Sequence, residues 1–180
     1  MAASLNNLAY LYKSQGRYTE AEPLYLEALD LHKQLLGDNH PLVATSLNNL
    51  AALYRSQGRY KEAEALFLQA LDLRKRLLGD NDPHVATSLN NLAGLYKSQG
   101  RYTEAEPLYL EALDLYKRLL GDNHPNTKTC RNNLQRLRQQ QKPTSLTWWQ
   151  WIIAIPIVIL WMPFYLLWML TRWLVRRFIR

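Results

Sequence analysis

Paired asparagines recur along this chain every 42 residues, and a lysine or arginine follows each pair at a fixed distance. An asparagine amide donates and accepts hydrogen bonds at once, so a column of amides can bind the backbone of an extended peptide whatever its side chains. A neighbouring column of cations would attract acidic side chains or a carboxylate. The predicted peptide-binding residues are Asn6, Asn48, Asn90, Asn7, Asn49, Asn91, Lys13, Arg55 and Lys97.

A structural interpretation of the same residues stays open. One asparagine of each pair could bond a neighbouring repeat, and the lysine and arginine column could be a solvated face. One further site favours ligand binding, because it reads Tyr10, Ala52 and Gly94 while its surroundings barely change. Variation confined to one site of this kind is expected where the choice of ligand is tuned.

Pairs of helices must position these residues. In the middle unit, an apolar pattern with helical spacing runs from Leu47 to Tyr54, and Gly58 then ends the helix. A second apolar pattern of this spacing begins at Tyr60 and ends at Gly79. On a helical wheel, the asparagines and the cation of the first helix lie opposite its core residues. The first helices are therefore expected to line a concave groove.

The repeated unit resembles a tetratricopeptide repeat, with a small residue at Ala9, Ala51 and Ala93 and a tyrosine three positions later. The repeat length and the Leu-Leu-Gly-Asp-Asn-His-Pro connector resemble kinesin light chains and their bacterial relatives. This resemblance covers residues 3–140. It implies an all-α solenoid of helical hairpins wound as a right-handed superhelix. In kinesin light chains such groove asparagines contact cargo peptides, so the same role is implied here, but a motor function is not.

The sequence predicts five segments. Three tetratricopeptide repeats occupy residues 1–127, and a capping helix over 128–141 turns polar where the repeats are apolar, as the solvated end of a solenoid requires. A linker over 142–147 leads into a membrane segment over 148–171. A basic amphipathic tail follows over 172–180.

The predicted membrane segment rests on apolar length and on the placement of tryptophan. Trp151–Leu170 holds 20 residues without a charge, enough for a transmembrane helix through a hydrocarbon core of about 30 Å. A re-entrant, membrane-embedded hairpin stays an alternative, because Pro156 and Pro163 lie inside the segment. The residues expected to anchor the chain at lipid headgroups are Trp148, Trp149, Trp151, Trp168, Trp173, Arg172, Arg176, Arg177 and Arg180.

Charge divides unevenly along the chain. Residues 1–127 hold 13 Lys and Arg against all 15 acidic residues, whereas residues 128–180 hold nine Lys and Arg and no acid. A basic segment beside an apolar stretch favours anionic membrane lipid as a partner over nucleic acid. No signal peptide is evident, so a single-pass membrane protein with cytoplasmic repeats is expected.

These features predict a non-catalytic, membrane-anchored scaffold that binds a peptide or partner protein of acidic character. We expect no cofactor, metal or catalytic residue, because the histidines lie in separate repeats and Cys130 occupies the small-residue site of Ser4, Ser46 and Ser88. Two alternatives remain. The first repeat lacks the lead-in of the others and could stack on a second copy as a homo-oligomer, or the chain could be a fragment of a larger signalling effector.

Overall fold

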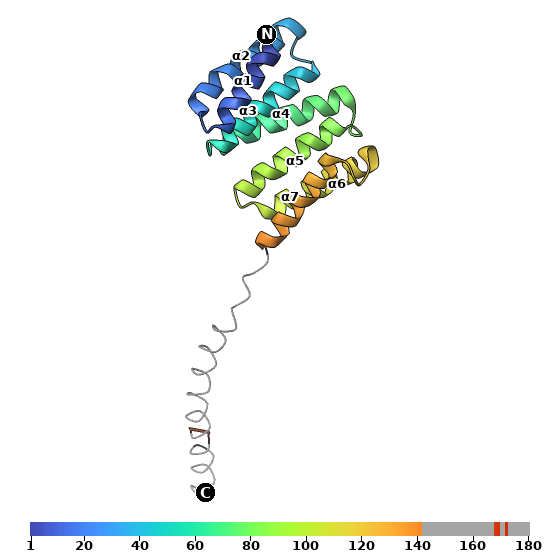
Figure 1. The fold of residues 1–180 in the computed structure, drawn as a ribbon. Helices are drawn as coiled ribbons and strands as arrows, with labels where there is room; N and C mark the ends of the chain where they lie inside the picture. The colour runs from blue at the N-terminus through green and yellow to red at the C-terminus, as the bar shows by residue number, and fades with distance from the viewer. Residues whose placement is uncertain (142–167, 170–171, 173–180) are drawn as a thin grey trace. The chain divides into compact units, whose positions relative to one another are not determined.

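The computed structural model describes residues 1–141, 168–169 and 172. Residues 1–141 form one compact unit of helices joined by short turns (Figure 1). These helices are α1 (Ala2–Ser14), α2 (Tyr18–Leu36), α3 (Pro41–Ser56), α4 (Tyr60–Leu78), α5 (Pro83–Ser98), α6 (Tyr102–Leu120) and α7 (Pro125–Gln141). The predicted all-α fold is confirmed for this part of the chain.

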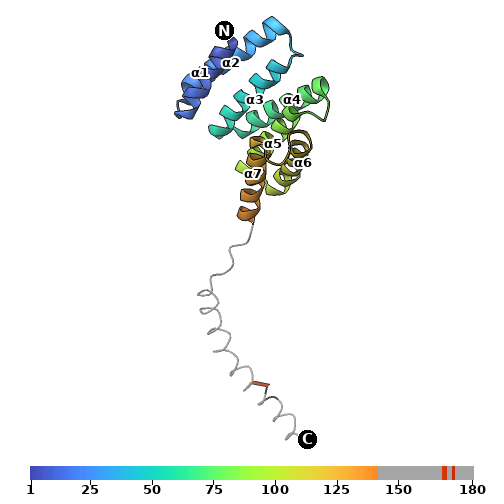
Figure 2. The ribbon, with the colours of Figure 1, turned by 45° about the vertical axis from the view of Figure 1, so that its right-hand side comes forward.

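The helices pack as successive hairpins, α1 with α2, α3 with α4 and α5 with α6, and α7 packs on α6 (Figure 2). The first helix of each hairpin (α1, α3 and α5) ends two residues before a glycine. The backbone of that glycine is in the left-handed region, with φ between 75° and 78°. That backbone lets the N–H of Arg59 donate to the carbonyl of Tyr54 at 2.9 Å, which closes the turn after α3. The predicted hairpin and its terminating Gly58 are therefore confirmed.

Alanines set the close approach of paired helices. Ala51 on α3 and Ala63 on α4 are fully buried, and Phe67 fills the space beside them. Because a methyl side chain keeps the helix axes close, a large ring from the second helix reaches the first. The same core arrangement recurs around Tyr109 in the third hairpin.

Helix α7 begins at a different residue from the one that the sequence predicts. It begins at Pro125, whereas the capping helix was expected over 128–141. The Nδ1 atom of His124 accepts a hydrogen bond from the N–H of Asn126 at 3.1 Å, so this histidine caps the helix. Proline suits the first turn, where its missing N–H costs nothing. The expected polar outer face is present, because Arg138 stands at the tyrosine site of the repeats and donates to Glu106 at 2.7 Å.

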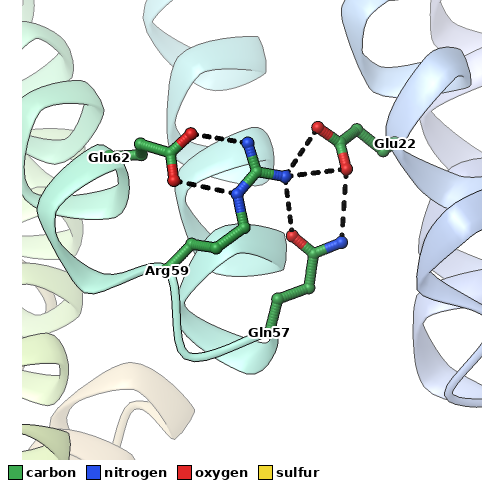
Figure 3. A network of polar contacts seen from close by, with 4 residues as sticks. All are labelled: Glu22, Gln57, Arg59 and Glu62. Atoms are coloured by element: carbon green, nitrogen blue, oxygen red, sulfur yellow. Dashed lines mark hydrogen bonds and ion pairs between the residues drawn. The ribbon is translucent and has the colours of Figure 1, made fainter.

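In the second and third hairpins, an arginine in the turn joins the hairpin to the previous one, as Arg59 bonds Glu22 and Arg101 bonds Glu64. The guanidinium of Arg59 donates to Glu62 of its own hairpin at 2.6 Å and to Glu22 of the previous hairpin at 2.8 Å, and Gln57 bonds both Arg59 and Glu22 (Figure 3). It also lies 3.8 Å above the ring of Tyr54. Burial alone would raise the pKa of Glu22, but hydrogen bonds from its neighbours outweigh burial and hold that pKa below its usual range.

The predicted linker and most of the predicted membrane segment and tail lie outside the described residues. Of the predicted anchors, Trp168 and Arg172 are described, and the guanidinium carbon of Arg172 lies 4.9 Å from the centre of the Trp168 ring. Within the described ranges no helix is long and apolar enough to cross a membrane. The membrane segment therefore stays a prediction.

Candidate peptide-binding groove

The predicted asparagine columns bond one repeat to the next. The second asparagine of each pair donates to the first asparagine of the preceding repeat. These bonds run from Asn49 to Asn6 at 3.4 Å, from Asn91 to Asn48 at 3.4 Å and from Asn133 to Asn90 at 3.2 Å. The first asparagine also reaches forward, as Asn48 donates to the Ser88 hydroxyl at 3.3 Å.

These bonds favour the interpretation that some of the predicted asparagines hold neighbouring repeats together and do not bind a ligand. Asn48 is only 4% exposed, so little of its amide remains for a ligand. Asn6, Asn49, Asn90 and Asn91 are half-buried, and each offers donors or acceptors beyond its bond between repeats. Peptide contact by the asparagines stays a prediction.

Replacing Asn48 by alanine is expected to lower the free energy of unfolding by about 1–3 kcal/mol, because its hydrogen-bond partners in the buried contact between repeats are left unpaired. Asn7 provides a matched control, since its side chain is exposed and makes no hydrogen bond within residues 1–141. Its alanine variant should unfold at the same urea concentration as the unaltered chain. Equal stability of both variants would show that the Asn48 bonds contribute nothing.

The predicted cations Lys13, Arg55 and Lys97 are half-buried, and none of them has an acidic partner among residues 1–141. Among residues 1–141, no ion pair or side-chain hydrogen bond joins Lys13, Arg55 or Lys97 to another group. Burial lowers the pKa of all three. Arg55 further lowers the pKa of Lys13, and Arg136 further lowers that of Lys97. An anion brought to these partly desolvated cations would therefore be held more strongly than at an exposed lysine.

Four of the nine predicted residues line one polar cavity of about 630 Å³. They are Arg55, Asn90, Asn91 and Lys97. The remaining five lie along the first helices outside this cavity. Six further residues line this cavity, and they are Gly94, Ser98, Tyr102, Tyr109, Asn133 and Gln140. Gly94 belongs to the variable site that the sequence marks as favouring ligand binding, whereas the other five were not predicted.

One of these five residues had a signal in the sequence, because Asn133 continues the asparagine pattern of the repeats into α7. Tyr109 had none, because it occupies an apolar core position of the repeat and is 2% exposed. Its contribution to the cavity follows only from the way α6 packs beside α5.

Reactive side chains are not gathered in this groove. Cys130 is 1% exposed and its thiol donates to the carbonyl of Tyr109 at 3.5 Å. Burial raises the pKa of that thiol to about 12. His32 is also buried, and its Nδ1 lies 2.8 Å from the Ser46 hydroxyl. The described residues contain no group of three His, Cys, Asp or Glu side chains placed to hold a metal ion.

Solved structures similar to this chain include two of kinesin light chain type. BtubC (BKLC) from P. vanneervenii is 32% identical, with a TM-score of 0.67, and the match covers 77% of this chain and 54% of that one. A protein of Podosopora anserina with nearly identical TPR-like repeats, provisionally named a kinesin light chain, is 26% identical with a TM-score of 0.69. That match covers 76% of this chain and 65% of that one. This chain thus spans roughly half to two thirds of the length of these relatives.

A third solved structure is similar in fold alone. The N-terminal domain of stress-induced protein-1 (STI-1) from C. elegans is 16% identical, with a TM-score of 0.52 over 76% of this chain and 94% of that one. No curated protein matches the chain. A family model described as "Tetratricopeptide repeat" matches residues 1–76, 48–118 and 84–143. The chain therefore belongs to the tetratricopeptide repeat family.

Proposed function

We propose that this chain is a non-catalytic, membrane-anchored scaffold whose groove binds an acidic segment of a partner protein. The tetratricopeptide fold is typical of protein–protein interaction scaffolds. One observation carries the proposal: Arg55 and Lys97 line a polar cavity of about 630 Å³ without an acidic partner among the described residues. A partly buried cation that the protein leaves unpaired is stabilised when a ligand supplies the anion.

The membrane part of the proposal rests on the sequence. The uncharged run Trp151–Leu170 with basic and tryptophan-rich flanks suits a single span that holds the repeats at the cytoplasmic face. Residues 128–180 carry nine Lys and Arg without an acid, so they would adhere to anionic headgroups. The scaffold would then concentrate its partner at a membrane surface.

A pull-down from cell membranes tests this function. A tagged full-length chain should appear in the membrane fraction and, after extraction in mild detergent, should retain a partner protein that carries an acidic segment. The charge-reversed variant Arg55→Glu/Lys97→Glu should retain at least tenfold less of that partner, because its two negative charges in the groove would repel the acidic segment. A chain truncated after Gln141 should leave the membrane fraction.

Lys61→Glu serves as the control, since Lys61 is exposed on α4 and does not line the cavity. This control should capture the partner as well as the unaltered chain does. Equal capture by the groove variant would contradict the proposed site. Recovery of the full-length chain in the soluble fraction would contradict the proposed anchoring.

A second candidate, stacking of another helical hairpin on the first repeat, is favoured by the exposure of leucines. Leu8 and Leu11 on α1 are 39% and 48% exposed, whereas their counterparts Leu50 and Leu53 on α3 are 2% and 0% exposed. An apolar face of this kind commonly marks an interaction site. In the same pull-down, recovery of a differently tagged copy of this chain as the main partner would support this candidate.

A further inference from the structure

Gly94 differs from every other glycine of residues 1–141 in its surroundings. The other six have φ between 75° and 85° at the ends of helices, and a Cβ added to them would meet nothing within 4 Å. Gly94 lies inside α5. A Cβ added there would lie 2.7 Å from Nη1 of Arg55 and 3.5 Å from the hydroxyl of Tyr109. The Arg55 guanidinium therefore occupies space that only a glycine leaves free.

A glycine in the interior of a helix is unfavourable by about 1 kcal/mol relative to alanine. The backbone of Gly94 does not require it, because the residue does not have a positive φ. The two equivalent sites hold Tyr10 and Ala52, so the helix tolerates larger residues there. The one feature that Gly94 provides is the close approach of the Arg55 guanidinium to α5.

The guanidinium at this position is ready to bind a ligand. A guanidinium has five N–H donors in a planar fork, and within the described residues no side-chain hydrogen bond or ion pair uses those of Arg55. The hydroxyl of Tyr109 lies beside it, and burial raises the pKa of that hydroxyl to about 12, so it remains an O–H donor at neutral pH. Both groups line the cavity that Lys97 and Asn90 also line.

We infer that Gly94 and Arg55 form an oxyanion subsite of the groove, in which Gly94 positions the guanidinium that binds one carboxylate or phosphate group of a peptide. The inference rests on the proposed binding function and names the subsite that selects the ligand. The planar fork of arginine matches both oxyanions in a bidentate manner. Residues 128–180 contain no Asp or Glu, so this segment of the chain offers no side-chain carboxylate to the subsite.

The substitution Gly94→Ala tests the subsite, because it separates binding from stability. Its Cβ would push away the flexible end of Arg55, while alanine favours the helix. The affinity of the full chain in non-ionic detergent for a fluorescent hexaglutamate peptide is expected to fall about ten- to a hundredfold, as for the loss of a charge-assisted hydrogen bond. The melting temperature should stay unchanged or rise. Ala52→Gly, the reverse change at the equivalent site of α3, should lower the melting temperature and leave the affinity unchanged.

A double-mutant cycle shows whether Gly94 acts through Arg55. The Arg55→Gln variant should bind hexaglutamate as weakly as Gly94→Ala does, and the double variant should bind no more weakly than either one. Independent, additive losses would overturn the inference, because they would assign Gly94 a separate structural effect. Unchanged affinity in Gly94→Ala and Arg55→Gln would also overturn it, while capture of the partner in the pull-down would leave the proposed function standing.

Two further peptides identify the source of the oxyanion. A hexaglutamine peptide should not bind, and a phosphoserine within a glutamine peptide distinguishes phosphate from carboxylate. Losses in Gly94→Ala for hexaglutamate alone support a carboxylate ligand, and losses for the phosphopeptide alone support a phosphate ligand. Failure of the unaltered chain to bind either anionic peptide would overturn the inference, and the pull-down then decides separately on the proposed function.

Discussion

Replacing Phe67 by alanine is expected to lower the free energy of unfolding by about 3–5 kcal/mol, which is the usual loss for a buried aromatic ring. Phe67 is 0% exposed and packs in a core cluster with Ala51, Leu53 and Ala63. This cluster also takes in residues of the first and third hairpins. The loss of the ring would therefore leave a cavity at the centre of the solenoid, where neighbouring helices cannot close in without breaking their contacts with the outer hairpins. Urea unfolding of the full chain, followed by circular dichroism, measures the loss.

The chain itself supplies the control for this experiment. The equivalent position in the first and third repeats holds Tyr25 and Tyr109, which are 1% and 2% exposed. Phe67→Tyr keeps the ring volume and should cost less than about 1.5 kcal/mol. A Phe67→Ala variant as stable as the unaltered chain would contradict the buried placement of this ring. A loss in Phe67→Tyr as large as that in Phe67→Ala would show that the site rejects any change.

The helices and their pairing could be predicted because their signals are local. The apolar spacing from Leu47 to Tyr54 and the turn at Gly58 lie within one hairpin, and each element follows from its own residues. Helix α7 begins at Pro125 and not at the predicted residue 128, although the residues before it are informative. His124 and Pro125 repeat the connector that precedes α3, and the same capping applies to them.

The candidate groove could be predicted only in part, because its contacts depend on how the repeats stack. The sequence places the asparagine columns and the cations on one face of the first helices. It does not show that Asn48 reaches Ser88, since that bond joins residues 40 positions apart on different helices. Likewise, the approach of Arg55 to Gly94 depends on the offset between α3 and α5. Contacts of this kind are fixed by the packing between hairpins and not by the pattern within one.

The thiol of Cys130 is expected to react with a disulfide reagent on the order of a thousandfold more slowly in the folded chain than in urea at pH 8. Burial raises its pKa to about 12, whereas a free thiol has a pKa of about 8.5, and only the thiolate attacks. Cys130 is also 1% exposed, so the reagent must wait for local opening of α7. The release of the coloured leaving group measures both rates. A Ser14→Cys change in a Cys130→Ser background provides the control, because Ser14 is exposed on α1 and its thiol should react at nearly the same rate in both states.

The raised pKa of the Cys130 thiol also predicts that the stability of the chain falls as the pH rises. The folded chain holds the thiol proton more tightly than the unfolded chain does, so its contribution to stability is present below the unfolded pKa of about 8.5 and is lost as the pH rises toward about 12. Between these values the unaltered chain should lose up to about 1.4 kcal/mol of stability per pH unit relative to Cys130→Ser. The difference between the two chains, measured by urea unfolding from pH 8 to pH 10, cancels the titration of the tyrosines that both share. A difference that stays constant over this range, or rapid labelling of the folded thiol, would place Cys130 in contact with solvent and would contradict its role as a small core residue between α6 and α7.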